Sequence, residues 1–414
     1  MRAAFFALLA ALFLSIQVAV AAGPGGEPDR PPGALLPSGY LHTEGSQIVD
    51  EHGNPVRIAA IGWNGGDGGP RVPEGLYVVN YRQTLGVMKR LGFNTIRLPY
   101  CDLWVGQRAG AMPLNNNRYT SINYDLNPDL KGLTALEVMD RIIAEAGRIG
   151  LKIIIDHHNS VCQGGQQTNG LWYDYRISAA EFESNWLDLA RRYRNNDTVI
   201  GYDLHNEPLE TAGWGTGGAN DWHAVAQALG RKLQAIDSGP LIIVEGPQTF
   251  HRRPNMPDAG PEGNLQGVRT LPIVLTVPGK VVYSVHEYPP SVADFRVNRD
   301  PAALVPHMNR IWGYLVSENI APVWIGEMGS SLKTDVDRRW AKTMVEYLNG
   351  DMAHLGGPAF QGDQQGIGWD WWCWGHVDDW IPNGILADWQ GTPRPDQYAI
   401  VKQILMRPID DNPR

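Results

Sequence analysis

Two glutamates follow short apolar runs of the sequence: Glu207 lies in the segment LHNEP and Glu327 in the segment WIGEMG. Two carboxyl groups held about 5 to 5.5 Å apart can hydrolyse a glycosidic bond with retention of configuration, because one protonates the departing oxygen while the other attacks the anomeric carbon. The competing interpretation is a pair of surface acids, which is what most glutamates are. The apolar neighbours of both residues favour the catalytic interpretation.

Other polar residues are suited to support such a pair. Arg97 offers a fixed positive charge and Tyr288 a hydroxyl donor, and both would favour the carboxylate form of Glu327. Asn206 precedes Glu207 directly, so we expect it to hydrogen-bond the sugar 2-hydroxyl, a contact that strengthens in the transition state.

Histidines and a tryptophan complete the predicted site. His158 and His286 are candidates to bind sugar hydroxyls or the carboxyl groups. A metal site that also includes His157 is the alternative, but no ligand spacing supports it, so we predict neither metal nor cofactor. Two-residue alternation in the segment WDWWCWG puts Trp372 and Trp374 on one face, and we predict that Trp374 is the platform for a sugar ring at the cleavage point.

The composition also suits a carbohydrate ligand, with fifteen Trp and fifteen Tyr against eight Phe. Rings with polar edges can stack on the CH faces of sugars while other groups bind the hydroxyls. We expect Trp369 and Trp371 to pack in the core. Further residues are candidate sugar platforms, with ordinary packing as the alternative: Trp63, Trp104, Trp172, Trp214 and Trp380.

Short β-branched runs alternate with amphipathic stretches along the chain. The strand candidates are residues 57–62, 95–99, 152–156, 199–204, 241–245, 281–286, 322–326 and 367–374. Helices are predicted from apolar spacings of three and four residues at 84–91, 133–149, 179–193, 222–236, 304–316, 336–348 and 396–405.

Eight such units predict an α/β fold: a single-domain (β/α)8 TIM barrel, preceded by a short β-hairpin around the turn at Gly53-Asn54. A doubly wound open sheet is the alternative, but no Gly-x-Gly-x-x-Gly turn follows the first strand. In a barrel the chemistry lies at the carboxyl ends of the strands, which is where the candidate residues fall.

Five motifs together resemble glycoside hydrolase family 5, in the 4/7 barrel group, and especially its bacterial endo-β-1,4-glucanases. In chain order they are GFNTIRLP at 92–99, DHH at 156–158, YDLHNEP at 202–208, VYSVHEY at 282–288 and PVWIGEMG at 322–329. The resemblance implies Glu207 as acid/base and Glu327 as nucleophile. It implies a shell of Arg97, His158, Asn206, His286, Tyr288 and Trp374.

The resemblance has further implications for residues outside this shell. His157 and His205 become structural neighbours of the site. Cys101 and Cys162 follow adjacent strands and are expected to form a disulfide, whereas Cys373 lies inside the last strand as a buried thiol.

The sequence departs from the family pattern at two places. Relatives have an aromatic-rich run after the first strand, where this chain has WNGGDGG at 63–69, and a tryptophan where this chain has Pro261-Glu262.

The five motifs and the two glutamates predict endo-acting hydrolysis of cellulose-type β-1,4-glucan. A β-mannanase, a xyloglucanase, an exo-acting β-glucosidase and a non-catalytic glycan-binding barrel are the alternatives.

The N-terminal segment predicts where the protein is located. We predict a signal peptide over residues 1–21, a Pro/Gly-rich linker over 22–37 and the catalytic domain over 38–410, hence a secreted or periplasmic protein. An uncleaved membrane anchor is the alternative.

The formal net charge of -9, without a basic cluster, argues against nucleic acid as a partner. We expect a monomer whose partner is a β-glucan polysaccharide or oligosaccharide.

Overall fold

The computed structural model describes residues 33–110, 114, 122–209, 211–248, 263–293, 296–376 and 383–409. They belong to one compact unit, Pro31–Arg414. The predicted signal peptide and most of the predicted linker lie outside the described residues. Residues 33–37 are described and pack on the domain, because the Ala34 N–H donates to the Met406 carbonyl and Leu36 is buried. The packed domain thus extends N-terminally of the predicted boundary at residue 38.

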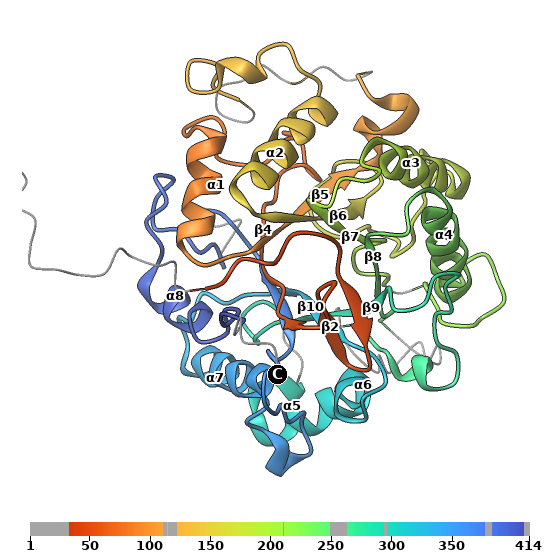
Figure 1. Ribbon diagram of the computed structural model, residues 1–414, viewed down its shortest axis with the longest axis vertical. Helices are drawn as coiled ribbons and strands as arrows, with labels where there is room; N and C mark the ends of the chain where they lie inside the picture. Colours follow the sequence, from red (N-terminus) through yellow and green to blue (C-terminus); the bar gives the residue numbers. More distant parts are fainter. Residues whose placement is uncertain are drawn as a thin grey trace, which may run out of the picture. The chain divides into compact units, whose positions relative to one another are not determined.

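Eight parallel strands close into a barrel, which confirms the predicted fold (Figure 1). Their order around the barrel is β10-β11-β4-β5-β6-β7-β8-β9. The strands are β4 (Ala59–Gly62), β5 (Thr95–Cys101), β6 (Lys152–Asn159), β7 (Val199–Asp203), β8 (Leu241–Glu245), β9 (Val281–Glu287), β10 (Val323–Met328) and β11 (Gly368–Trp371). Nearly all strand residues are buried, as expected when helices cover the outside of a parallel sheet.

Helices surround the barrel in Figure 1, and most agree with the predicted stretches; the exceptions are residues 304–316 and α8, which ends four residues before the predicted end at 405. They are α1 (Tyr81–Arg90), α2 (Ala135–Ile149), α3 (Ala179–Arg192), α4 (Trp222–Ile236), α5 (Pro301–Met308), α6 (Tyr314–Ser317), α7 (Asp335–Asn349) and α8 (Pro395–Val401). Local sequence sets their ends: α2 begins with a capping box of Thr134 and Glu137, and it stops at Gly150, whose φ of 86° is left-handed.

One predicted helix, over 304–316, is divided. The chain forms α5, then a π-helix at Asn309–Gly313, then α6. Pro306 lies inside α5 and has no N–H to donate, which weakens the α-helical ladder there. Single turns of 3-10 helix occur elsewhere at Asp102–Trp104, Gly106–Arg108, Pro128–Leu130, Gln266–Arg269, Arg296–Arg299 and Ala353–Leu355.

A small antiparallel sheet covers one end of the barrel. It contains the predicted hairpin, β2 (Gln47–Val49) and β3 (Pro55–Val56), and one further strand, β1 (His42–Glu44). Ile48 and Val56 of this sheet belong to a buried cluster with Ile154, Ile243 and Trp324 from the barrel strands. This hydrophobic plug closes the end opposite to the rim that carries the polar residues.

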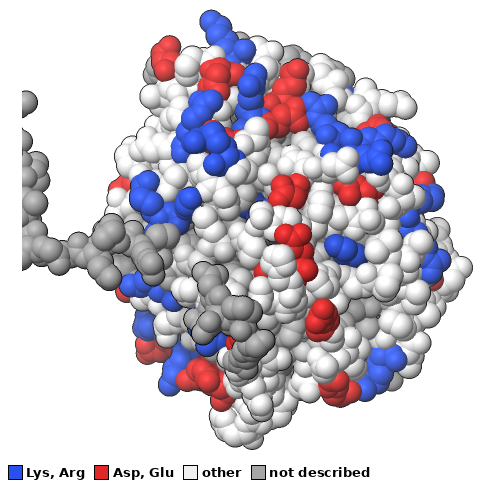
Figure 2. All heavy atoms as spheres, in the orientation of Figure 1, with Lys and Arg blue, Asp and Glu red and all other residues white. Residues whose placement is uncertain are grey.

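The helical surface carries mixed charges. On the face drawn in Figure 2, basic and acidic side chains stand side by side over the upper helices. Two ion pairs link neighbouring helices: Arg192 of α3 contacts Asp140 of α2, and Lys232 of α4 contacts Glu183 of α3. Among the described residues, no helix is long and apolar enough to cross a membrane.

The predicted disulfide is present, whereas Cys373 lies two residues beyond the end of β11 and not inside the strand as predicted. Cys101, at the end of β5, forms a disulfide with Cys162, in the loop after β6. Cys373 is a buried free thiol. The disulfide therefore anchors a rim loop, whose next residues line the cleft described below.

Candidate active site

The carboxyl ends of the barrel strands bring together seven of the eight predicted site residues. Arg97 comes from β5, His158 from β6 and Asn206-Glu207 from the loop after β7. His286 lies in β9, Tyr288 follows it and Glu327 lies in β10, while Trp374, the eighth, follows β11 with its side chain buried in the core.

Glu327 receives a hydrogen bond on each carboxylate oxygen. The Arg97 guanidinium donates to Oε1 at 2.6 Å, and the Tyr288 hydroxyl donates to Oε2 at 2.6 Å. Both contacts are buried, and donors to a carboxylate stabilise its ionised form. This arrangement matches the partners predicted for Glu327 from the sequence.

Arg97 is the centre of a buried ionic network. Besides Glu327, its guanidinium donates to Asp203 at 2.9 Å and to the Asn206 amide oxygen at 2.8 Å, and it lies 3.1 Å from Asp156. Burial opposes its charge, but the surrounding carboxylates outweigh burial and raise the pKa of Arg97 well above its usual value. The arginine therefore stays charged and links the carboxyl ends of β6, β7 and β10.

Glu207 has different surroundings. It lies after β7 with a φ of 47°, a left-handed conformation that is uncommon outside glycine. His286 Nδ1 is 3.0 Å from Glu207 Oε1, and the Glu207 N–H donates to Glu245 Oε2 at 2.7 Å. Burial raises the pKa of Glu207 to about 7, so its carboxyl group holds a proton at mildly acidic pH.

The two glutamates share one space. One carboxylate oxygen of Glu207, one of Glu327 and a ring nitrogen of His286 all lie within 4.8 Å of one another. This spacing agrees with the short separation that retaining hydrolysis requires. A metal ion would find three ligand atoms here, but Arg97 and Tyr288 already donate to both oxygens of Glu327. We therefore assign no metal to the described site.

His158 and Trp372 form the floor beside the carboxylates. Their rings stack with centroids 5.1 Å apart and planes at 9°. Burial disfavours a charged imidazole, but Asp156, at 2.7 Å from Nδ1, and Asp67 outweigh burial and raise the pKa of His158 to about 9. A Cβ at Gly62 would lie 2.5 Å from the Trp372 ring, so this close approach requires glycine.

The predicted role of Trp374 needs correction. Trp374 is 1% exposed in the hydrophobic core and does not line the cleft, whereas Trp372 does. Strand β11 ends at Trp371, so the two-residue alternation used for the prediction stops before Trp372. Beyond that point the Trp374 N–H donates to the Gly62 carbonyl and the side chain turns into the core.

The other tryptophans are mostly structural. Trp369 and Trp371 pack in the core as expected. Four of the five further candidate platforms are also buried, namely Trp63, Trp104, Trp172 and Trp214. Trp380 lies outside the described residues.

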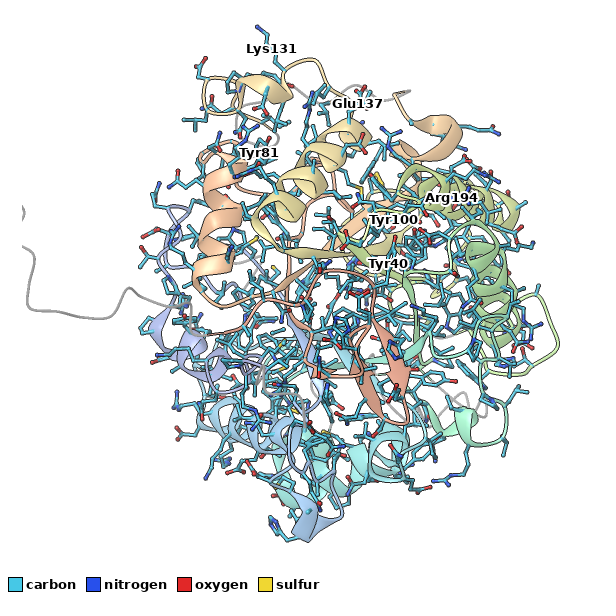
Figure 3. All side chains as sticks on the ribbon, viewed as in Figure 1. Tyr40, Tyr81, Tyr100, Lys131, Glu137 and Arg194 are labelled. Atoms are coloured by element: carbon cyan, nitrogen blue, oxygen red, sulfur yellow. A yellow bond between two sulfur atoms is a disulfide. The ribbon has the colours of Figure 1, made fainter. Side chains whose placement is uncertain are left out.

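The neighbours His157 and His205 are structural, as the resemblance implies. Their Nδ1 atoms are 3.0 Å apart, and His157 Nε2 is 2.8 Å from Asp102. The Tyr100 ring, labelled in Figure 3, packs edge-on against His157 and against Trp186 of α3. This packing fills the space behind the site.

The cleft has a volume of about 560 Å³. Its walls are rich in glycine and amide groups from two loops, after β4 and after β6, and Asp67 joins these loops by accepting the Gly65 and Gly165 N–H groups. The expected loss of an aromatic run after the first strand thus leaves a polar wall. Asp67, Trp372 and Glu245 were not predicted as site residues, although Glu245 ends a predicted strand like the residues that were chosen.

The chain is similar to known proteins over most of its length. The profile of the cellulase family (glycosyl hydrolase family 5) matches residues 49–378. An endoglucanase of Paenibacillus polymyxa is 37% identical, with 90% of this chain and 88% of that protein covered. The major extracellular endoglucanase of Xanthomonas campestris pv. campestris is 29% identical, with 96% and 75% covered.

A solved structure agrees with these matches. That of a hyperthermophilic endocellulase from Pyrococcus horikoshii has a TM-score of 0.74 and 28% identity, covering 91% of this chain and all of that one. The family profile spans all eight strands of the barrel, from β4 to β11. The chain therefore belongs to the cellulase family, glycosyl hydrolase family 5.

Proposed function

We propose that this glycoside hydrolase cleaves internal β-1,4-glucosidic bonds of cellulose-type glucan with retention, and that Glu207 is its acid/base and Glu327 its nucleophile. The observation that carries the proposal is a pair of glutamates in one cleft, within 4.8 Å, with opposite hydrogen-bond surroundings. One carboxyl group is suited to hold a proton and the other to stay ionised.

In the first step, Glu207 gives its proton to the glycosidic oxygen while a carboxylate oxygen of Glu327 attacks the anomeric carbon. The C–O bond to the leaving sugar breaks, and an ester to Glu327 forms. Arg97 and Tyr288 orient the attacking group.

In the second step, the Glu207 carboxylate takes a proton from water. The water oxygen attacks the anomeric carbon and the Glu327 ester is released as carboxylate. The two inversions give net retention, and Glu207 regains its proton for the next cycle.

Neighbouring residues are suited to bind the sugar. The Asn206 amide oxygen already accepts from Arg97, so its NH2 group remains to donate to the sugar 2-hydroxyl. His158, protonated at neutral pH, is a further hydroxyl donor. Trp372 replaces Trp374 in the proposed role of sugar platform, because it lines the cleft between the two loops.

The choice of glucan is supported by the relatives. The two similar proteins are named endoglucanases, and one solved structure of the Pyrococcus horikoshii endocellulase is a complex with cellotetraose. An endo-acting enzyme should lower the viscosity of carboxymethylcellulose much faster than it releases reducing ends. The same assay on mannan, xyloglucan and mixed-linkage glucan tests the alternatives. Faster hydrolysis of one of these polymers than of carboxymethylcellulose, or release of glucose alone, would overturn the proposal.

We further propose that the protein is exported and acts as a monomer. Residues 1–21 have the pattern of a signal peptide, and the Xanthomonas campestris relative is named extracellular. All groups of the proposed mechanism come from a single chain. N-terminal sequencing of protein recovered from the medium should begin at Ala22 or close to it, and light scattering should give the mass of one chain.

A further inference from the structure

Glu245 is a buried carboxyl group that the proposed mechanism does not use. It ends β8 and is 0% exposed. Its Oε2 atom accepts the Glu207 N–H at 2.7 Å and lies 3.4 Å from His286 Nε2. Glu245 Oε1 and His286 Nε2 have no hydrogen-bond partner within the described part of the chain. Glu245 and His286 are both buried and both contact the proposed acid/base, so their unpaired atoms need an explanation.

Burial and the surrounding charges together set the protonation of Glu245. Glu207 and Asp203 face it from the β7 side, His286 from β9, and Arg97 from β5. Burial, followed by the negative charges of Glu207 and Asp203, raises the pKa of Glu245 well above its usual value. Burial also lowers the pKa of His286 to about 3, so its ring is neutral. A neutral carboxyl group therefore faces a neutral imidazole.

A hydrogen bond between these two groups, which lie 3.4 Å apart, would fix the tautomer of His286. A protonated Glu245 can donate its O–H to Nε2, and the single ring proton then lies on Nδ1. Nδ1 is the atom 3.0 Å from Glu207 Oε1, so it donates to that oxygen. Glu207 Oε1 is thus engaged, and Oε2 is left to carry the proton that catalysis transfers.

The backbone contact acts on the same residue. Glu207 has a φ of 47°, and such a conformation persists in a non-glycine residue only when its surroundings hold it. The hydrogen bond from the Glu207 N–H to Glu245 is one contact that stabilises this backbone conformation. Gly326 leaves room for the assembly, since a Cβ there would lie 3.1 Å from His286 Nε2.

We propose that Glu245 is a positioning residue for the acid/base: it holds the Glu207 backbone from behind and, through His286, selects the Glu207 oxygen that carries the proton. The inference rests on the proposed role of Glu207. It adds a residue that touches neither substrate nor reacting atoms.

The test compares Glu245→Leu with Glu245→Gln on two substrates. Leucine removes both contacts, whereas the glutamine oxygen can accept the Glu207 N–H and its NH2 group can donate to His286. We expect Glu245→Leu to lower kcat on cellotetraose by about 10²-fold, the low end for losing a general acid, and hydrolysis of 2,4-dinitrophenyl cellobioside by less than about tenfold. Glu245→Gln should recover at least about tenfold of the loss on cellotetraose.

Glu287→Gln is the matched control, because Glu287 also ends a strand, is 0% exposed and accepts from Trp312 Nε1. Glu287→Gln should change the rates of hydrolysis of the two substrates by the same factor. Equal losses of Glu245→Leu on both substrates, or no recovery with glutamine, would overturn the inference. Glu207→Gln measured alongside separates the causes: if it discriminates between the substrates and Glu245→Leu does not, only the role of Glu245 fails.

A second measurement keeps the inference testable if the leucine variant does not fold. Because Glu245 is neutral in this account, Glu245→Gln should leave the basic limb of the kcat/KM profile in place. A displacement of about one pH unit or more would mean that Glu245 carries a charge beside Glu207, which contradicts the proposed hydrogen-bond arrangement.

Discussion

Glu207 and Glu327 have the same side chain, share one cleft and differ in what surrounds them. Glu327 accepts from a guanidinium and a hydroxyl, both at 2.6 Å. Glu207 has a neutral imidazole at 3.0 Å and a second carboxyl group behind its backbone. Charged donors stabilise a carboxylate, whereas at Glu207 burial outweighs the pull of His158 and Arg97 and raises the pKa of the carboxyl group.

The difference shows that neighbouring strands set the surroundings of each carboxyl group. The donors to Glu327 come from β5 and the end of β9, and the neighbours of Glu207 come from β8 and β9. The barrel places these strand ends at one rim, so each glutamate receives partners that are remote in sequence. Changes to those partners should therefore affect one glutamate more than the other.

The largest separation should come from Glu207→Gln. Glutamine cannot protonate the leaving oxygen, so we expect hydrolysis of cellotetraose to fall by about 10² to 10⁴-fold. An activated aryl cellobioside needs no protonation and should form the intermediate at a rate much closer to that of the unaltered enzyme. Steady-state and burst kinetics on both substrates measure this. Comparable losses in the first step on the two substrates would mean that Glu207 is not the acid.

Removing one donor from Glu327 should have a smaller effect that is insensitive to the leaving group. Tyr288→Phe leaves Arg97 in place and deletes one hydrogen bond to a charged group, which is worth about 1.5 to 3 kcal/mol. We expect kcat/KM to fall by roughly 10 to 10²-fold on both substrates. A loss confined to cellotetraose would link Tyr288 to the acid instead.

The pH dependence should report Glu207. Its pKa is raised to about 7, so the acid is present below that pH and is lost as pH rises through it. We predict that kcat/KM on cellotetraose falls about tenfold per pH unit above about pH 7. The same profile with an activated aryl substrate should fall less in the glycosylation step. A basic limb near pH 5 would contradict the environment described for Glu207.

The smallest effect on rate should distinguish two tryptophans. Trp372→Ala removes a cleft surface, and we expect KM to rise by roughly tenfold, which corresponds to about 1.4 kcal/mol of lost binding, with little change in melting temperature. Trp374→Ala creates a core cavity and should cost about 3 to 5 kcal/mol of unfolding free energy. Denaturant unfolding of both variants checks this, and a stable Trp374→Ala with raised KM would restore the original prediction.

The fold was predictable because its signals are local. Each barrel strand is a short apolar run, and each large helix has apolar residues at three and four residue spacing, so the elements and their order follow from periodicity. Residues 304–316 show the limit, since apolar spacing predicts one helix there although Pro306, which has no N–H to donate, lies within it. The N-terminal sheet gained β1, whose three residues carry too weak a pattern to be recognised.

The site was predictable to the extent that it uses strand ends and family motifs. Arg97, Tyr288 and Glu327 meet as expected because their strands fix where they point. Trp374 failed because strand periodicity was extended past the last residue of β11. Glu245 was missed because its role depends on contacts with a backbone N–H and an imidazole, which no spacing in the sequence reveals.

The central claim is that Glu327 forms the covalent bond to the sugar while Glu207 handles the proton. A 2-deoxy-2-fluoro cellobioside with an activated leaving group should trap the intermediate, and peptide mass analysis of the inactivated protein should find the label on Glu327. A label on Glu207 or any other residue, or no covalent adduct together with products of inverted configuration, would contradict the account.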